Sequence, residues 1–463
     1  MFHDVRRARA LDRMRIMGTS VMWFRADLRL HDNPALRAAV EAGPDGVVPL
    51  VVLDDHLWGP GAGVRTACFA RLLAEFDERI GGLHVVHGDP VAEVVRVARA
   101  VDAGTVHVAA AHTPYGARRD AAVERALADH DVALVRTGSA YAVSPGRVTK
   151  PDGTPYRVYT PFHRAWSAHG WRAPAPAVRS VPWLRPGGRT HRIPEVAVPE
   201  GVTLPPLGEE AARRRWRDWK EQVTQYDDVR DLPGVDRTSR MSVHLKWGTI
   251  HPRTLLADLD GHDSDGVRSY VREIAFREFY ADVLHHRPDS AHGYYNPALA
   301  RMEYDRPGES LDAWRTGTTG YPIVDAGMRQ LAAEGWMHNR VRMIVASFLV
   351  KDLHVEWTHG AAHFMDRLAD GDLASNQHGW QWVAGCGTDA SPYYRVFNPT
   401  TQGKKFDPDG TYVRRWVPEL RDVPDRFVHE PWTAPTPPDG YPAPIVDHAE
   451  ERREALRRYE AVR

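Results

Sequence analysis

Strands and helices are predicted to alternate along the first third of the chain, between residues 21 and 137. Short apolar runs, rich in valine and leucine, are separated by segments with the apolar spacing of helices. The predicted strands are 21–24, 47–53, 83–86, 106–110 and 132–135, and the predicted helices are 34–42, 65–80, 91–101 and 117–130. Strands that are apolar throughout and alternate with helices form parallel sheets covered on both faces. We therefore predict a doubly wound parallel α/β domain over residues 21–144, with a ligand crevice at the carboxyl edge of its sheet.

The rest of the chain is predicted to hold a linker and an all-α domain. Residues 145–210 are rich in proline and glycine and show no periodicity, which is typical of an interdomain linker. Helical spacing begins near residue 211 and is found at 216–226, 252–259, 266–285, 323–334, 339–355 and 361–368. We therefore predict a helical domain over residues 211–463. Residues 1–20 hold five arginines and two aspartates without an apolar core, so we predict a disordered or misannotated extension rather than a secretory signal.

The composition limits the classes of protein to consider. The net charge of the 463 residues is −1, so a nucleic-acid site must be a local patch. No apolar run approaches the length that spans a membrane, so we expect no membrane partner. The two cysteines, Cys68 and Cys386, can build neither a disulfide framework nor an iron–sulfur cluster, and reduced thiols favour a cytoplasmic location. We expect no metal site, and a monomer, because no segment has the pattern of an interface.

Tryptophan is the outlier in composition, with 15 copies. Four of them fall between residues 320 and 398, at Trp336, Trp357, Trp380 and Trp382. Indoles are among the most easily oxidised neutral side chains, so a run of them can carry electrons, although core packing is the commoner role. Arg342 and Asp370 lie in the same apolar segments, where burying two charges is costly unless they form a close ion pair. An exposed pair is the alternative.

Four further patterns carry chemistry. Asn376 offers an amide that can bond a cofactor nitrogen in either redox state, or simply support a turn. Glu273, Phe276, Arg277 and Tyr280 share one face of a predicted helix that also holds Tyr270, and an exposed Glu273–Arg277 pair is the alternative. Tyr226 and the hydroxyl-rich residues 238–242 precede a helix, as in a phosphate cradle or an ordinary N-cap. The remaining pattern is a set of polar groups that either contact nucleic-acid phosphates or are ordinary surface charge, namely Arg230, Arg340, Arg395, Asn339 and Lys404.

Long ordered matches show that the chain resembles the photolyase/cryptochrome family over nearly its whole length. They include WFRADLRLHDNPAL at residues 23–36, TSRMS at 238–242, REFY at 277–280, and the segments FNPTTQGKKFD and RRWVPELRDVP near the end. WMHNRVRM at 336–343 and DGDLASN at 370–376 resemble the class I cyclobutane pyrimidine dimer photolyases. A six-four photolyase would carry paired histidines where this chain has His338, Asn339 and Arg340.

The resemblance implies that the all-α domain binds FAD in a U shape. Glu273 would lie close to the cofactor, and Asn376 would face flavin N5. The residues that match FAD-binding positions are Tyr226, Thr238, Ser239, Arg240, Met241, Ser242, Tyr270, Arg277, Arg342, Asp370, Asp372 and Asn376.

The resemblance also implies the reaction and its partner, UV-damaged DNA. Reduced FAD would absorb blue or near-ultraviolet light and give an electron to a pyrimidine dimer that is flipped into a pocket above the flavin. Matching lesion-contact positions are Glu273, Phe276, Asn339, Met343 and Trp382, and matching DNA contacts are Arg230, Arg340 and Arg395. The electron chain that reduces the flavin would use Trp380, Trp357 and Tyr304.

Two residues depart from the family pattern. Phe276 and Tyr304 each stand where a tryptophan is expected, so we predict weaker lesion binding and altered photoreduction. Lys246, in HLKWG, matches a contact to a deazaflavin antenna such as 8-hydroxy-5-deazaflavin, and a folate (methenyltetrahydrofolate) is the alternative antenna.

Two other functions are compatible with parts of this pattern. One is a cryptochrome-like blue-light photoreceptor without repair activity. About thirty residues follow the predicted core, which is short for a signalling tail. The other is a plain nucleotide-binding α/β protein with a helical partner domain, which leaves the tryptophan set unexplained.

Overall fold

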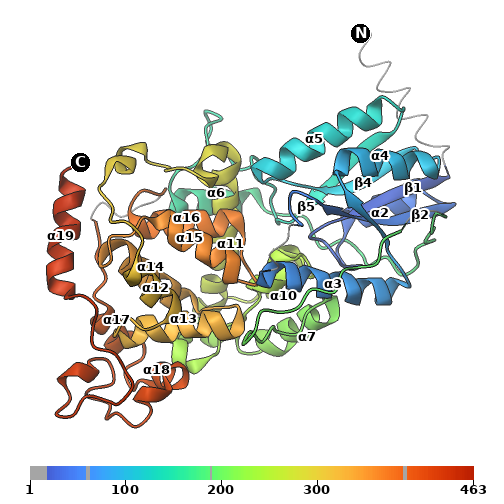
Figure 1. Cartoon of the computed structure of the whole chain (residues 1–463). Coiled ribbons are helices and arrows are strands. Elements are labelled where there is room, and N and C mark those ends of the chain that lie inside the picture. Colours follow the sequence, from blue (N-terminus) through green and yellow to red (C-terminus); the bar gives the residue numbers. More distant parts are fainter. Residues whose placement is uncertain (1–17, 59–62, 188–189, 389–393, 463) are drawn as a thin grey trace.

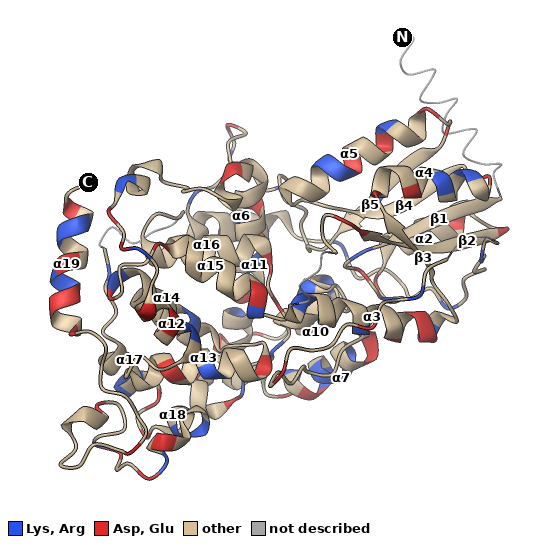
Figure 2. Ribbon diagram, viewed as in Figure 1, with Lys and Arg blue, Asp and Glu red and all other residues tan. Residues whose placement is uncertain are grey.

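The computed structural model describes residues 18–58, 63–187, 190–388 and 394–462, and they form two domains (Figure 1). A sheet with helices on both faces makes up the first domain, and helices make up the second. Lysine and arginine are interspersed with aspartate and glutamate over both domains (Figure 2). None of the helices in the described ranges is long and apolar enough to cross a membrane.

The predicted doubly wound sheet is confirmed. Its strands are β1 (Thr19–Phe24), β2 (Gly46–Asp54), β3 (His84–Gly88), β4 (Thr105–Ala110) and β5 (Ala133–Ser139). All are parallel in the order β3-β2-β1-β4-β5. Because the order reverses direction between β1 and β4, a crevice is expected outside their carboxyl ends.

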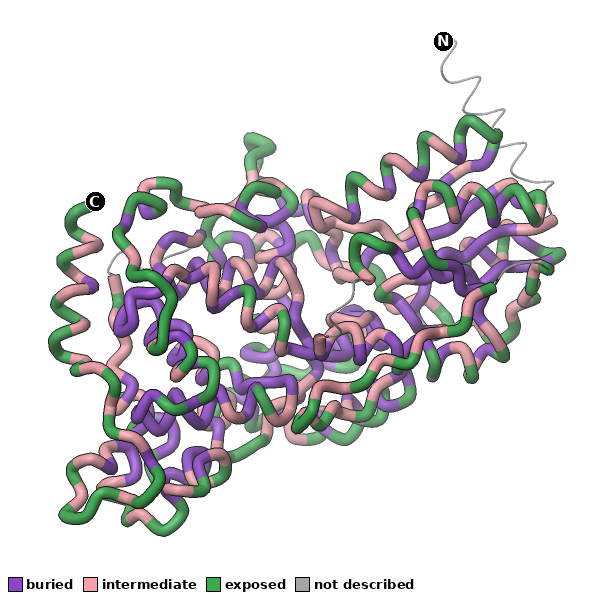
Figure 3. Tube along the Cα trace, in the orientation of Figure 1, coloured by how far each residue is buried: buried purple, intermediate pink, exposed green. Residues whose placement is uncertain are grey.

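Alternate residues of β1 explain how both faces of the sheet are covered. Val21 and Trp23 pack with α4 (Pro90–Ala100) and α5 (Pro114–Ala128). Met22 and Phe24 pack on the other face with α2 (Pro34–Ala42) and α3 (Val64–Ile80). The period of two in a strand sends neighbouring side chains to opposite faces, which is why consecutive residues such as Val21–Phe24 are all apolar. Figure 3 shows the sheet as a buried layer.

The segment predicted as a linker contains a helix, α6 (Tyr159–His169). Tyr159, Phe162 and Trp166 are buried in the core of the helical domain. The indole nitrogen of Trp166 donates to Glu278 on α11 (Asp265–His286) at 2.6 Å. The spacing of these three aromatics, i, i+3 and i+7, is helical, and the proline and glycine content around them hid it. At the other end of the first domain, β1 includes Thr19 and Ser20 from the predicted extension, and residues 1–17 lie outside the described residues.

The helical domain is confirmed, with several shifted boundaries. The helix predicted at 216–226 is α7 (Glu209–Lys220), the 3-10 turn η1 (Val223–Gln225) and α8 (Tyr226–Val229). The helix predicted at 339–355 ends earlier, as α14 (Asn339–Lys351), and α15 (Trp357–Arg367) begins earlier than predicted. The other elements are η2 (Pro233–Val235), α9 (Ser242–Lys246), α10 (Pro252–Leu259), η3 (Pro288–Ala291), η4 (Pro297–Arg301), α12 (Glu309–Thr316), α13 (Pro322–Glu334), α16 (Leu373–Ala384), α17 (Pro399–Phe406), α18 (Thr411–Trp416), η5 (Pro418–Leu420), η6 (Pro431–Thr433) and α19 (His448–Glu460).

Buried polar contacts fix the two domains to each other. Asp32, which follows β1, accepts hydrogen bonds from Arg253 at 2.7 Å and from the backbone N–H of Ala175 at 2.8 Å. The Glu209 carboxylate at the start of α7 accepts from the N–H groups of Leu30 and His31. Removing one partner of a buried pair leaves a charge without compensation. The domain arrangement is therefore specified by polar contacts as well as by packing.

Candidate functional site

One face of α11 combines a carboxylate, two rings and a guanidinium. Ser264 caps the helix by accepting from the N–H of Val267. The four residues predicted to share a face, Glu273, Phe276, Arg277 and Tyr280, are all half-buried, whereas Ile274, Ala275, Glu278 and Phe279 between them are buried. The helix α11 therefore has one buried face, which packs in the core, and one half-buried face, which carries these four side chains. The predicted common face is therefore present.

Arg230 and Glu273 form an ion pair at the end of this face. Arg230 Nη2 lies 2.6 Å from Glu273 Oε1, and Arg230 Nη1 donates to Ser269 Oγ at 2.6 Å. Burial alone would lower the pKa of Arg230, but Glu273, Tyr226 and Asp231 together outweigh burial, so the pKa lies above its ordinary value. The structure thus joins a predicted DNA contact to a predicted lesion contact.

Phe276 is stacked face to face on Tyr159 from α6. Their ring centroids are 3.4 Å apart and the planes differ by 7°. The phenol of Tyr159 donates to the backbone oxygen of Arg272, which fixes the ring. The two rings form one apolar surface beside Glu273. Sequence reasoning missed Tyr159 because it lies in the predicted linker, although its helical spacing with Phe162 and Trp166 was a signal.

The turn at residues 238–242 is held in place from two sides. Tyr270 donates to Ser239 Oγ at 3.0 Å, and Arg215, which the sequence did not single out, donates to the backbone oxygens of Thr238 and Ser239. Arg240 has a φ of +52°, a strained conformation for a side chain of that size. The hydroxyl of Thr238 is buried and has no hydrogen-bond partner among the described residues. Buried polar groups normally have a hydrogen-bond partner, so this hydroxyl is free to bond a ligand atom.

The other predicted cradle residues surround this turn. Arg240 lies over the Trp336 ring at 4.3 Å and pairs with Asp236 and Glu334. Trp336 donates from its indole nitrogen to Ser242 Oγ at 3.3 Å. Met241 is buried, and Tyr226 packs edge-on against Tyr270 with centroids 5.3 Å apart.

Asp372, Lys246 and Arg277 form a second charged group. Burial alone would raise the pKa of Asp372, but Lys246, Arg277 and the hydrogen bonds from Ser375 together outweigh burial, so the pKa is below its ordinary value. Burial lowers the pKa of Lys246, and Asp372 opposes that change. Arg277 donates to the backbone oxygens of Ala140 and Leu245. Lys246, which is predicted to contact an antenna, therefore interacts electrostatically with Asp372, which is predicted to bind FAD.

The predicted Arg342–Asp370 pair is present, with 2.8 Å between Arg342 Nη2 and Asp370 Oδ2. Asp370 is buried, and its second oxygen, Oδ1, has no hydrogen-bond partner among the described residues. Asn376 on α16 is also buried, and its amide nitrogen donates to Ala361 O at 3.1 Å and to Gln377 Oε1 at 2.9 Å. These bonds fix the plane of the amide, which a precise contact to a cofactor nitrogen requires.

Two of the three predicted electron carriers, Trp380 and Trp357, lie on adjoining helices. Trp380 on α16 packs against Phe364 of α15 with ring centroids 5.0 Å apart. Gly360 of α15 leaves room for this indole, because a Cβ there would lie 2.1 Å from Trp380 Cη2. Trp357, the first residue of α15, is fully buried one turn before Gly360. Tyr304 is largely buried, and burial together with its hydrogen bond to Tyr294 raises the pKa of Tyr304 well above the ordinary value.

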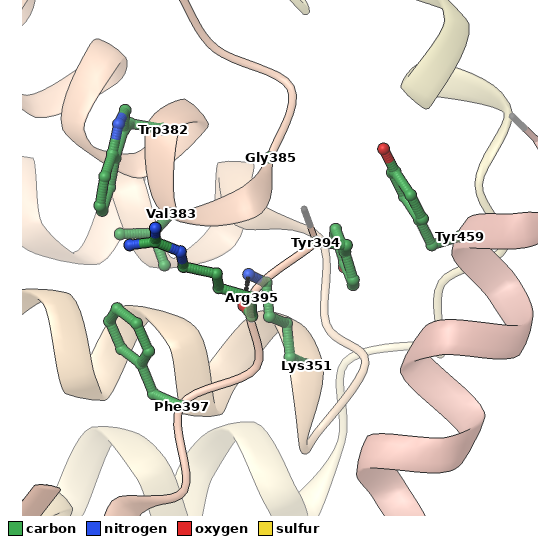
Figure 4. A pocket seen from close by; sticks show the side chains of 8 residues that line it. All are labelled: Lys351, Trp382, Val383, Gly385, Tyr394, Arg395, Phe397 and Tyr459. Carbon is green, nitrogen blue, oxygen red and sulfur yellow. Dashed lines mark hydrogen bonds between the residues drawn. The ribbon is translucent and has the colours of Figure 1, made fainter. Parts of the chain in front are cut away.

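Arg395, a predicted DNA contact, lies beside the half-buried Trp382 in a pocket (Figure 4). Its backbone oxygen accepts a hydrogen bond from the buried Lys351. Tyr394 and Tyr459 are stacked at the other end of this pocket, with centroids 4.3 Å apart. The buried amino group of Lys351 therefore holds the backbone from which the Arg395 side chain extends.

The remaining predicted lesion and DNA contacts belong to α14. Asn339 is exposed at its first turn. Arg340 pairs with Asp231 at 2.8 Å, and its guanidinium lies over the Phe406 ring and near the Met343 sulfur. In the described ranges, no group of three or more histidine, cysteine, aspartate or glutamate side chains could hold a metal ion.

Comparisons with known proteins match both domains. A model described as "FAD binding domain of DNA photolyase" matches residues 270–461, and a model described as "DNA photolyase" matches residues 20–180. The chain is 43% identical over 450 residues to a deoxyribodipyrimidine photo-lyase from Streptomyces griseus, covering 94% of this chain and 98% of that protein.

Two solved structures share the whole architecture. A bacterial class III photolyase from Agrobacterium tumefaciens superposes with a TM-score of 0.91 at 36% identity, covering 96% of this chain and 98% of that one. An archaeal photolyase from Sulfolobus tokodaii, which has two FAD molecules, superposes with a TM-score of 0.83 at 28% identity, covering 96% of this chain and all of the other. The class I subclass predicted from the sequence is not confirmed by these matches.

Proposed function

Because this chain belongs to the DNA photolyase family, we propose that its helical domain binds FAD and repairs cyclobutane pyrimidine dimers in DNA when it absorbs light. Its activity is that of a deoxyribodipyrimidine photo-lyase, the name carried by relatives that match it over nearly their full length. The proposal concerns how the residues of this chain perform that reaction.

Two buried orphan atoms carry the assignment of the FAD site. Thr238 Oγ1 and Asp370 Oδ1 both belong to residues predicted to bind FAD, and each lacks a partner among the described residues. A hydroxyl beside the backbone N–H groups of a turn suits a phosphate oxygen. A carboxylate oxygen suits the hydroxyl or N–H donors of a ribityl or flavin group. The donor and acceptor chemistry of this chain therefore fits FAD.

The residues that would hold FAD divide by charge. The hydroxyls and backbone of residues 238–242 would hold its phosphates. Tyr226 and Tyr270 would line the part of the site around these phosphates. Arg277 and Arg342, each fixed by a backbone oxygen, would stabilise negative charge on the reduced ring. Asn376 would face the flavin with an amide whose orientation is already set.

Bound FAD, in its reduced form, supplies the light-excited electron that opens the dimer. The chain supplies the surface on which the dimer lies. Phe276, backed by Tyr159, gives an apolar wall for the flipped bases, and Trp382 and Met343 contribute further apolar contacts. Flipping costs a few kcal/mol and costs less for a damaged, poorly paired base.

Glu273 and Arg230 would change partners when DNA binds. In the structure they pair at 2.6 Å. A DNA phosphate competes for the guanidinium of Arg230, because Arg binds phosphate in the same bidentate manner as carboxylate. The released Glu273 carboxylate can then accept hydrogen bonds from the ring N–H groups of the dimer. The two residues thus couple backbone binding to lesion contact.

The subclass and the antenna are finer parts of the proposal. The segments at 336–343 and 370–376 support class I, and the match to a class III structure makes class III the alternative. A deazaflavin antenna is proposed from Lys246, with a folate or a second FAD as alternatives, the last because the Sulfolobus tokodaii photolyase holds two FAD molecules. Mass spectrometry of the chromophores released from the purified protein identifies the antenna.

FAD retention tests the proposed site. We expect the purified protein to be yellow and Thr238→Val to release FAD more readily, because it removes the orphan hydroxyl without changing the side-chain shape. Thr249→Val is the matched control, since the hydroxyl of Thr249 is already bonded to His244. Equal FAD content in the two variants would contradict the assignment of Thr238. A photoreceptor without repair activity predicts bound FAD and no light-dependent repair.

A further inference from the structure

Tyr294 lies against Trp357, the inner buried indole of the predicted electron chain. Their ring centroids are 5.8 Å apart and the planes are at 82°. Trp357 is fully buried, and its indole nitrogen has no hydrogen-bond partner among the described residues. An oxidised Trp357 therefore has no adjacent group to take its proton. It stays positively charged and remains a strong oxidant for a neighbouring side chain.

Tyr294 has the proton acceptor that Trp357 lacks. Its hydroxyl donates to Glu356 Oε1 at 2.7 Å, and Glu356 is the residue immediately before Trp357. A phenol loses its proton as it is oxidised, and a positioned carboxylate at hydrogen-bond distance can take that proton in the same step. Burial, and then the bond to Glu356, raise the pKa of Tyr294 above its ordinary value, so the phenol holds its proton until it is oxidised.

We propose that Tyr294 is the electron donor to oxidised Trp357 and that Glu356 accepts its phenolic proton. The proposal rests on the proposed flavin site, because the oxidant is the light-excited flavin acting through Trp380. One electron passes from the Tyr294 phenol to the Trp357 radical cation, and the O–H proton passes to Glu356 Oε1. The products are neutral Trp357, a neutral Tyr294 radical and a protonated Glu356 carboxyl group.

This assignment gives Tyr304 a different role from the one its sequence position implies. Tyr304 stands where the family has an outer tryptophan, and its hydroxyl donates to the hydroxyl of Tyr294. Tyr304 is therefore a positioning residue that directs the Tyr294 proton toward Glu356. Loss of its hydroxyl leaves the Tyr294–Glu356 bond and the Tyr294–Trp357 contact in place.

Radical spectroscopy of the FAD-loaded protein tests the proposal. The oxidised holoenzyme is illuminated with blue light and frozen, and ring-deuterated tyrosine identifies the tyrosyl radical by electron paramagnetic resonance. We expect Tyr294→Phe to lose the tyrosyl signal and to show a tryptophan radical instead. We expect Glu356→Gln to slow formation of the tyrosyl radical by about 100-fold, the lower end of what a positioned proton acceptor contributes. Tyr304→Phe is expected to keep the signal.

The control and the decisive outcomes are defined by neighbouring residues. Tyr295→Phe changes the next tyrosine, whose ring lies under Arg287, and is expected to behave as wild type. Retention of the tyrosyl radical in Tyr294→Phe, or its loss in Tyr304→Phe alone, would overturn the assignment. If a phenylalanine variant fails to bind FAD, two other measurements decide whether Glu356 accepts the proton. These are the rate of tyrosyl radical formation in Glu356→Gln and the same rate for the wild-type protein in D₂O. A rate that is unchanged in both would exclude proton transfer to Glu356. A wild-type protein that binds FAD but forms no radical would overturn the electron chain, whereas a protein without FAD would overturn the proposed function itself.

Discussion

Phe276 shows how one side chain can differ from the family pattern without removing the surface that it provides. Because the ring of Phe276 is smaller than that of the tryptophan expected at this position, the sequence predicts weaker lesion binding. In the structure, Tyr159 stacks behind Phe276 at 3.4 Å, so the ring is backed over its whole face. The proposed lesion-binding surface therefore has two layers of aromatic rings, and we expect its rigidity to offset part of the smaller area.

We expect Phe276→Ala to weaken binding of dimer-containing DNA by ~1–3 kcal/mol, the contribution of one base–aromatic stack. Binding of undamaged DNA is the control and should change little, because phosphate contacts do not involve this ring. Fluorescence anisotropy with matched damaged and undamaged oligonucleotides measures both. An equal loss for the two DNAs would show that Phe276 supports the fold rather than the lesion.

Lys351 links protein stability to pH. Burial lowers the pKa of this ammonium group to about 7, although Asp352 opposes the change. An unfolded lysine has a pKa of about 10.4, so between these two values the unfolded chain binds one proton more than the folded chain. The stability contribution of Lys351 is complete above the unfolded pKa and is lost as the pH falls toward 7.

Replacing Lys351 with methionine should therefore flatten the rise of the urea unfolding midpoint between pH 7 and pH 9. The exposed Lys405→Met is the matched control and should keep the wild-type slope. The same slope in both variants would show that Lys351 is charged in the folded protein. A constant loss at all pH values is expected in addition, because the Arg395 carbonyl loses its donor.

The inner tryptophans Trp357 and Trp380 belong to helices α15 and α16, which pack closely because residue 360 is a glycine. Gly360→Ala would place a Cβ 2.1 Å from Trp380 Cη2, so the indole must move. We expect a loss of ~1–3 kcal/mol in stability, typical of overpacking, together with slower photoreduction of the flavin. Gly379→Ala, where a Cβ meets nothing within 4 Å, is the stability control on the neighbouring helix. Thermal unfolding compares them, and equal melting temperatures would contradict the packing argument.

A helix or strand could be predicted from the sequence when its apolar spacing continued without interruption over its own residues. The five strands of the sheet and helices such as Pro34–Ala42 and Pro252–Leu259 were confirmed because their apolar spacing is continuous. Helix α6 was missed since proline and glycine surround a short helical pattern. The shared face of α11 followed from its spacing.

Contacts between distant segments lay beyond local patterns. Tyr159 on Phe276, Arg215 at Ser239 and Tyr294 on Trp357 join residues whose separation in the chain carries no periodic signal. The roles of the site residues came from the resemblance, and they stay predictions until tested.

At the scale of the whole molecule, charge is local rather than global. The net charge of −1 and the interspersed signs in Figure 2 exclude a general attraction to DNA. Binding must therefore depend on a few local contacts, and Arg395 beside Trp382 is one of the arginines that we propose for them (Figure 4). We expect Arg395→Ala to reduce the slope of log K against log salt by about one, because each phosphate contact releases about one counterion. Arg315→Ala, on α12 and paired with Asp312, is the control. An unchanged slope would exclude Arg395 from the phosphate contacts.

The central claim is that the site in the helical domain uses light to split pyrimidine dimers. The most direct measurement is repair of a thymine-dimer oligonucleotide by the chemically reduced holoenzyme, in blue light and in the dark, with restored thymine measured by chromatography. We predict restoration only in the light, and in proportion to the FAD content of the preparation. Bound, fully reduced FAD with no restoration of thymine in the light would contradict the account.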